Sequence, residues 1–224
     1  MKIKKAFLPA VLLVLISLVA GCGTPPPLVS QKYLNDNSLI SGQPCSAPCF
    51  QDITVGQTTF ADALSKVRAN ALFKDVQSQD DPPQAAWATA DGEPCCQMTA
   101  NKETGLVDAI LLRVAPVMTV GDVIAKYGEP EYVSVLQQDY TPEETALGLV
   151  YPKQGNVLWV MPGNAESTID ETDPVVVVLY LNPQEFDALI ENALLSAWEG
   201  YKPLSDYRQS TPVVTPKYTL TPIQ

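Results

Sequence analysis

The chain has 224 residues, enough for one domain with a sizeable core, and carries 25 acidic against 14 basic residues. It contains no histidine, which excludes Ser-His-Asp and Cys-His catalysis, histidine-ligated zinc and a histidine pH switch. The acidic balance argues against a nucleic-acid partner, which requires a basic face. We therefore expect a protein that is not an enzyme, holds no metal or cofactor and binds no nucleic acid.

Residues 1–21 have the organisation of a secretory signal peptide, in which three lysines precede an apolar run of about 15 residues. A helix that spans a bilayer needs roughly 20 apolar residues, so this run is too short for a permanent span. The segment ends with Leu18-Val-Ala-Gly-Cys22. This sequence resembles the lipobox of bacterial lipoproteins, and the resemblance implies cleavage after Gly21 and acylation of Cys22, for example with palmitate.

The expected location is extracytoplasmic, with the protein held through lipid on Cys22 to the cell membrane, or to the outer membrane if the host has one. Removing the three lysines of the leader leaves 11 basic against 25 acidic residues, a net charge of −14. Such a chain is repelled by anionic lipids, so the acyl chains must provide the anchorage. Residues 22–43 begin with a Pro-rich stretch, and we expect them to form a flexible linker.

Four further cysteines are present at positions 45, 49, 95 and 96, and an even set in an exported protein predicts two disulfides. Because neighbouring residues on a strand point to opposite faces, we favour bonds from Cys95 and Cys96 to separate members of the pair Cys45 and Cys49. The other two connectivities stay open. A four-cysteine zinc site is the alternative, although the spacing is poor for a tetrahedral site.

In chain order, the first predicted unit occupies residues 44–115. Its helix, 59–72, begins with Thr59 as N-cap and Asp62 at the third helical position, where a carboxylate favours the helix N-terminus. Short β-type runs separated by turn residues follow the helix. These runs are 85–90, 95–100 and 105–114.

The second predicted unit occupies residues 116–200. Thr119 and Asp122 cap its helix, 119–127, and Gly128 and Pro130 end it. The β-type runs of this unit are 147–151, 156–161 and 175–181. A further helix starts at Asn182 and runs to Trp198, and the Ser/Thr/Pro-rich residues 201–224 are expected to be an unstructured tail.

The two units resemble each other in sequence. Over an offset of 60, Thr59, Asp62 and Lys66 match Thr119, Asp122 and Lys126, and four apolar positions on one helix face also coincide. Connections between the β-type runs are too short for crossover helices, so the strands should pair antiparallel. The predicted fold is therefore α+β, with two helix-plus-three-strand antiparallel repeats and a C-terminal helix.

The pattern Met118-Thr-x-x-Asp-Val-x-x-x-Tyr-Gly-x-Pro-x-x-Val133 resembles the SmpA/OmlA (BamE-like) lipoproteins. A tandem arrangement of such units is similar to the secreted β-lactamase inhibitor proteins. The resemblance covers about 16 residues of the second unit and is poor in the first, where a helix stop is missing. It implies a non-catalytic protein-interaction module in the cell envelope, with an envelope or secreted protein as partner.

Two other functions stay open. The protein could bind a small ligand, with Trp87, Trp159 and Tyr151 as an aromatic platform, although such aromatics are usually core residues. It could be a hydrolase that uses carboxylates, such as Glu129 and Glu131. The oxygen-rich segment 163–174 lacks the order of a calcium-binding loop and is predicted to be a solvated hairpin loop.

Overall fold

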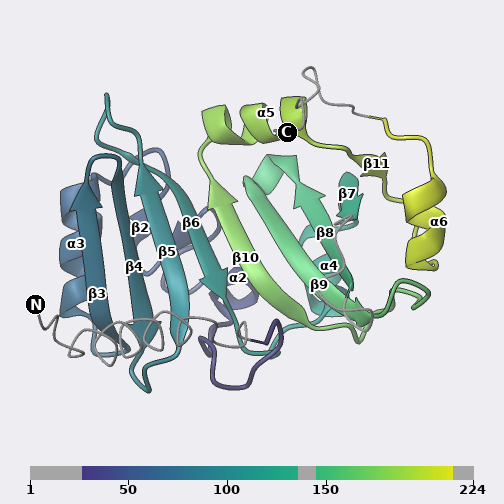
Figure 1. Ribbon diagram of the computed structural model, residues 1–224, viewed down its shortest axis with the longest axis horizontal. Helices are drawn as coiled ribbons and strands as arrows, with labels where there is room; N and C mark the ends of the chain where they lie inside the picture. Colours follow the sequence, from purple (N-terminus) through teal and green to yellow (C-terminus); the bar gives the residue numbers. More distant parts are fainter. Residues whose placement is uncertain (1–26, 136–144, 214–224) are drawn as a thin grey trace, which may run out of the picture.

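The protein has an α+β fold in which helices pack on one large antiparallel sheet (Figure 1). The structure is a computed structural model that describes residues 27–135 and 145–213. The helices are α2 (Ser38–Ser41), α3 (Phe60–Ala69), α4 (Val120–Tyr127), α5 (Pro183–Asn192), α6 (Leu204–Gln209) and the 3-10 turn η1 (Pro152–Gln154). No helix among the described residues is long and apolar enough to cross a membrane.

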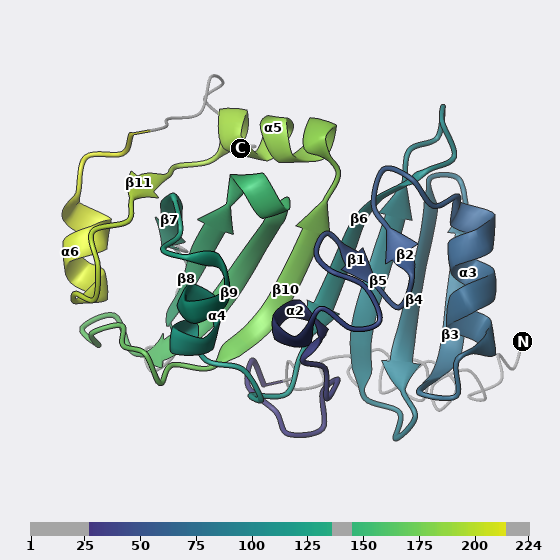
Figure 2. The ribbon, with the colours of Figure 1, turned by 180° about the vertical axis from the view of Figure 1, so that it is seen from behind.

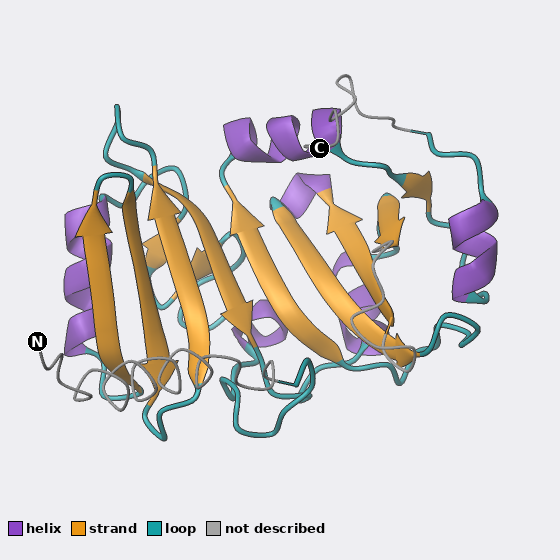
Figure 3. Cartoon of the chain, viewed as in Figure 1, coloured by secondary structure: helices purple, strands orange, loops and turns teal. Residues whose placement is uncertain are grey.

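Nine strands form the large sheet, and β1 (Cys49–Phe50) and β2 (Ile53–Thr54) form a separate pair (Figure 3). The order in the large sheet is β11-β7-β8-β9-β10-β6-β5-β4-β3. Its strands are β3 (Phe73–Asp80), β4 (Pro83–Thr89), β5 (Pro94–Ala100), β6 (Val107–Arg113), β7 (Tyr132–Val135), β8 (Thr145–Tyr151), β9 (Asn156–Gly163), β10 (Val175–Leu181) and β11 (Ser196–Ala197). The predicted units 44–115 and 116–200 thus share one sheet, joined where β6 pairs with β10.

One face of the sheet is covered by α2, α3, α4 and the β1–β2 pair, which all lie on the near side in Figure 2. A row of cross-strand partners on this covered face is buried from end to end. The row is Trp87, Cys96, Leu112, Val178, Leu158, Leu149 and Val133. Helix residues such as Val67 and Val123 pack into the same core.

The caps of α3 and α4 lie where the sequence places them. The Thr59 hydroxyl accepts a hydrogen bond from the backbone N–H of Asp62. Thr119 makes a complete capping box, because its hydroxyl accepts from the N–H of Asp122 while the Asp122 carboxylate accepts from the Thr119 N–H. Gly128, with φ of 81°, follows the last residue of α4.

Each of the two helices is followed by four strands, so the prediction of three strands in each unit is wrong. The additional strands are β3 and β7. Strand β3 has a mostly polar, exposed sequence without the alternation that marks a half-buried strand, because it lies at the edge of the sheet and is held by β4 alone. Strand β7 has only four residues, too few to show a period.

The prediction of a flexible linker over 22–43 is wrong for its second half, and the structure does not describe residues 22–26. Tyr33, Leu34 and Leu39 are buried. The backbone of Leu34 forms a parallel bridge to Val114 at the end of β6. We call residues 27–42 the strap, because they pass round this end of the sheet from one face to the other. Buried apolar contacts and backbone hydrogen bonds therefore order a segment that composition alone predicts to be flexible.

Two predictions at the C-terminal end also need correction. Helix α5 ends at Asn192 rather than Trp198, because Ser196 and Ala197 pair with β7 as the edge strand β11. The predicted tail over 201–224 is ordered through residue 213, including α6, whose Leu204 and Tyr207 are buried. Residues 214–224 lie outside the described part of the chain.

Candidate functional site

The face of the sheet opposite α3 and α4 is the candidate functional site, and we call it the open face. Its first row of cross-strand partners is Gln79, Gln84, Thr99, Ala109 and Leu181. Its second row is Gln77, Ala86, Gln97, Leu111, Leu179, Val157, Val150 and Tyr132. Its third row is Arg113, Val177, Trp159, Gly148 and Ser134. Arg113 is the only charged residue in these three rows.

The open face is polar on the strands at one edge of the sheet and apolar on the strands at its centre. Strands β3, β4 and β5 present four glutamines and Thr99, whereas β6, β10 and β9 present apolar side chains. An antiparallel sheet with one solvated face normally shows polar residues throughout that face. The apolar half of the open face therefore requires a cover or a partner.

Two parts of the chain provide some cover for the apolar half. From α5, Phe186, Leu189 and Ile190 pack with Val150 and Val157. From the strap, Leu28 packs with a small cluster at the opposite end of the strands, formed by Ala146, Met161 and Val176. Leu111, Trp159 and Val177 remain partly exposed between these two covers.

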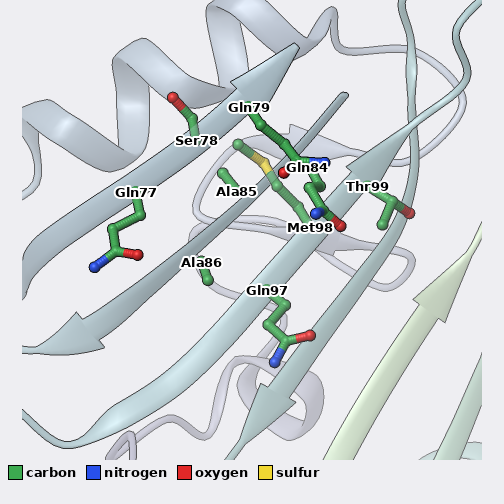
Figure 4. A pocket seen from close by; sticks show the side chains of 9 residues that line it. All are labelled: Gln77, Ser78, Gln79, Gln84, Ala85, Ala86, Gln97, Met98 and Thr99. Carbon is green, nitrogen blue, oxygen red and sulfur yellow. The ribbon is translucent and has the colours of Figure 1, made fainter. Parts of the chain in front are cut away.

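Two hollows lie on the open face. The first, of about 350 Å³, is lined mainly by the glutamines of β3, β4 and β5 together with Ser78 and Thr99, and has no ionisable lining residue (Figure 4). The second, of about 320 Å³, lies over β6, β10 and β9 and is lined by Leu28, Leu111, Trp159, Met161 and Val177, with Gln97 and Arg113 among its polar members. Gln97 lines both hollows, so they adjoin on the open face.

Gly148 leaves room for the indole of Trp159 on this face. A Cβ atom at position 148 would lie 3.5 Å from Nε1 of Trp159. The indole therefore extends over β8 rather than away from the sheet. A rigid aromatic ring held in this way provides contact area at little cost in conformational entropy.

The two disulfides of the described chain join neighbours in sequence: Cys45 to Cys49 and Cys95 to Cys96. The favoured pairing between the two cysteine groups is therefore wrong. The physical reason is a register irregularity in the β4–β5 ladder, where Trp87 pairs with Cys96 but Ala88 pairs with Pro94. Cys95 is left without a ladder partner, and the alternation of faces on which the prediction rested does not hold there.

The other residues that the sequence analysis singled out do not form one site. Trp87 and Tyr151 belong to the core of the covered face, whereas Trp159 lies on the open face, so they make no common platform. Glu129 and Glu131 are both exposed. No calcium, zinc or other metal cluster of three Cys, Asp or Glu side chains occurs in residues 27–135 and 145–213.

The acidic loop before β10 is held by its own hydrogen bonds. The Thr172 hydroxyl and N–H both donate to Asp170, which lowers the pKa of that carboxyl. The N–H of Asp170 donates to Asp173, whose pKa is raised by burial. The loop therefore satisfies the carboxylates of Asp170 and Asp173 within itself, but it is not solvated throughout as predicted, because Ile169 is completely buried in the core.

The glutamines of the open face are not among the candidate site residues that the sequence predicts. Their signal is the alternation of polar residues in Gln77-Ser-Gln79 and Gln97-Met-Thr99, which marks one face of a strand. Because β3 was not recognised as a strand, the glutamines on neighbouring strands could not be placed side by side. Cys22 lies outside the described residues, and its acylation stays a prediction.

Comparison with protein-family models, with curated proteins and with solved structures gives no match for this chain. What can be said of its class follows from the fold and the open face alone.

Proposed function

We propose that this protein is a lipid-anchored, non-catalytic interaction module of the cell envelope, which binds a partner protein on its open face. One observation carries the proposal: a broad sheet face that α5 covers only in part, with glutamines, a partly exposed Trp159 and few charges, those of Arg113 and of Asp108, which accepts a hydrogen bond from Thr99. Protein-binding surfaces are depleted of acidic residues at their centre and enriched in aromatic residues and arginine.

We further propose that the module arose by duplication of a helix-plus-four-strand unit. Backbone hydrogen bonds that attach each helix to the last strand of its unit support this. The N–H of Phe60 donates to Gly105 O (2.8 Å), and the N–H of Val120 donates to Asp173 O (3.0 Å). Two residues away on each segment, the donors and acceptors are again equivalent: Val107 N donates to Thr58 O, and Val175 N donates to Met118 O.

The registers of the strands support the same proposal. Pairs in the β5–β6 ladder correspond to pairs in the β9–β10 ladder at constant offsets of 60 and 68 residues. The corresponding pairs are Cys96–Leu112 and Asn156–Tyr180, Met98–Ile110 and Leu158–Val178, and Ala100–Val107 and Val160–Val175. Both ladders have their irregularity immediately before the last of these pairs. Independent units would not be expected to share the position of a β-bulge.

The proposed interface is tested by changing exposed residues of the open face. Gln84→Arg with Gln97→Arg adds two charges and bulk to this face without touching the core, and should abolish capture of the partner after mild-detergent extraction from the native host. Ser65→Arg, on the outer side of α3, is the matched control and should leave capture unchanged. Equal capture by both variants would place the interface elsewhere.

A specific observation also favours the small-ligand alternative. The hollow beside Leu28 and Trp159 has a size typical of ligand pockets and is mostly apolar. A ligand in this hollow would raise the melting temperature of the purified protein without a partner protein, and Gln97→Arg would abolish that shift. This outcome would replace the protein-interaction proposal.

A further inference from the structure

The strap fixes the point at which the N-terminal segment leaves the folded body. Leu28 packs on the open face against Met161 and Val176. The Tyr33 hydroxyl donates to the carbonyl oxygen of Pro27 (2.5 Å), and the Arg113 guanidinium lies 5.8 Å from the centre of the Tyr33 ring. The chain before Pro27 therefore departs from the open face, close to the pairing of β6 with β10.

The distance from this point to the proposed lipid is limited by chain length. Six residues separate Cys22 from Leu28, and an extended chain spans at most about 3.5 Å per residue, which gives roughly 20 Å. To reach past the covered face, the chain would have to go round the sheet and a helix layer, each about 10 Å thick. These two layers alone take up the whole reach of about 20 Å, before any lateral distance is added, so the chain length strongly disfavours a membrane against the side of α3 and α4.

The distribution of charge disfavours a second orientation, in which the strands stand perpendicular to the membrane and the strap end of the sheet contacts the lipid. Two loops project from this end, the β4–β5 turn at 90–93 and the loop 164–174, and together they contain six acidic and no basic residues. Each charge near an anionic lipid surface is worth about 1 kcal/mol. The open face is less acidic than the strap end. Its three rows contain Arg113 and no carboxylate, although Asp108 accepts a hydrogen bond from Thr99, and α5, which covers part of this face, carries Glu185, Asp187 and Glu191.

We infer that the anchored protein lies with its open face directed at the membrane, so that the partner of this face is a membrane protein, with a segment exposed at the lipid surface. This inference rests on the proposed function in that it requires lipid on Cys22. The lipid surface itself is a poor ligand for a chain with one cation on the relevant face. A membrane protein can supply hydrogen bonds for the glutamines and an apolar side chain for the hollow beside Trp159.

The orientation is tested on the acylated protein bound to vesicles of phosphatidylcholine and anionic phosphatidylglycerol that carry an energy-transfer acceptor on the lipid headgroups. A fluorescent non-natural side chain is placed at Gln97 on the open face or at Ser65 on α3, both of which are exposed. Energy transfer should be higher from position 97 than from position 65. Insertion of about 20 Gly/Ser residues between Gly23 and Thr24 should abolish the difference, because the longer tether removes the restraint.

Equal transfer from the two positions, or higher transfer from position 65, would overturn the inferred orientation. Mass spectrometry of the vesicle-bound protein first establishes that Cys22 carries lipid, so a failure of the anchor is distinguished from a failure of the orientation.

For the partner, a photo-crosslinking side chain at position 97 should form adducts with membrane proteins in the native host, and adducts confined to soluble proteins would overturn the inferred partner class. Loss of capture by the Gln84→Arg, Gln97→Arg variant would still support the open face as the interface in that case.

Discussion

At the residue scale, the cysteines show how far residue types can be interpreted without geometry. Their even number, in a chain whose first residues resemble a signal peptide, predicts oxidation, but their pairing depends on a β-bulge that the sequence does not mark. Each closed loop is short, so the stabilisation by loop closure is smaller than for a bond across about 50 residues. Proteolysis without reductant should give no crosslink between the segments around Cys49 and Cys95, and such a crosslink would contradict the structure.

A second prediction at this scale concerns Tyr207, whose buried ring stacks on Trp198. Burial raises the pKa of the Tyr207 phenol from 10.0 to about 12, with a smaller opposing effect from the Glu199 N–H that it accepts. The folded state therefore holds this proton more tightly than the unfolded state. The free energy of unfolding should fall as pH rises from about 10 to about 12.

Urea unfolding at about pH 9 and about pH 11 measures this effect. Tyr207→Phe removes the hydroxyl that donates to Gly200 O, so it should lower stability at pH 9. Between pH 9 and pH 11, the free energy of unfolding of the Tyr207→Phe variant should fall by less than that of the unsubstituted protein. Identical losses in the two proteins would show that Tyr207 does not contribute to the pH dependence.

At the scale of elements, the sequence predicts best where a local pattern, such as a helix cap or an apolar stripe, agrees with the tertiary contacts. The helices at 59–72 and 119–127 were recognisable from caps and an apolar stripe, and both are present with modified ends. The strap and α6 were not recognisable, because composition does not show the residues far away in sequence that they contact. Strand β3 lacks the alternation of a half-buried strand, and β7 is too short to show a period. The open face is not apparent from the sequence, since it exists only once the strands are in register.

Core substitutions at equivalent positions test whether the two halves unfold together. Met98 on β5 and Leu158 on β9 are both almost completely buried. Met98→Ala and Leu158→Ala should each lower the free energy of unfolding by about 2–5 kcal/mol. Because both side chains belong to one core, each variant should unfold in a single transition monitored by circular dichroism and by fluorescence.

Leu72→Ala is the control for this experiment, because Leu72 is 55% exposed and should tolerate the change. If Leu158→Ala produced a biphasic transition, with one half of the chain unfolding first, the two units would be separate folding domains that share only strand pairing.

At the scale of the whole molecule, anchorage determines which surfaces are available to other proteins. Cys22→Ala should prevent incorporation of radioactive palmitate and leave residues 1–21 attached, whereas Thr24→Ala should be labelled and cleaved normally. The reason is that the cysteine thiol is the acceptor for the lipid in the lipobox that residues 18–22 resemble. Normal labelling of Cys22→Ala would refute the anchor and remove the basis for the inferred orientation.

The strap also has a consequence for the order of events during folding. The strap is synthesised early, yet it contacts segments that are synthesised much later: Arg113 donates to the Tyr33 hydroxyl across 80 residues, and the Tyr127 hydroxyl donates to Leu39 O across 88. Contacts at such sequence separation form slowly, because a long loop must close first. The strap should therefore dock late. If Cys22 carries lipid as proposed, the lipid is joined to the assembling sheet by a longer flexible segment until the strap docks, and docking then brings the folded body close to the lipid surface.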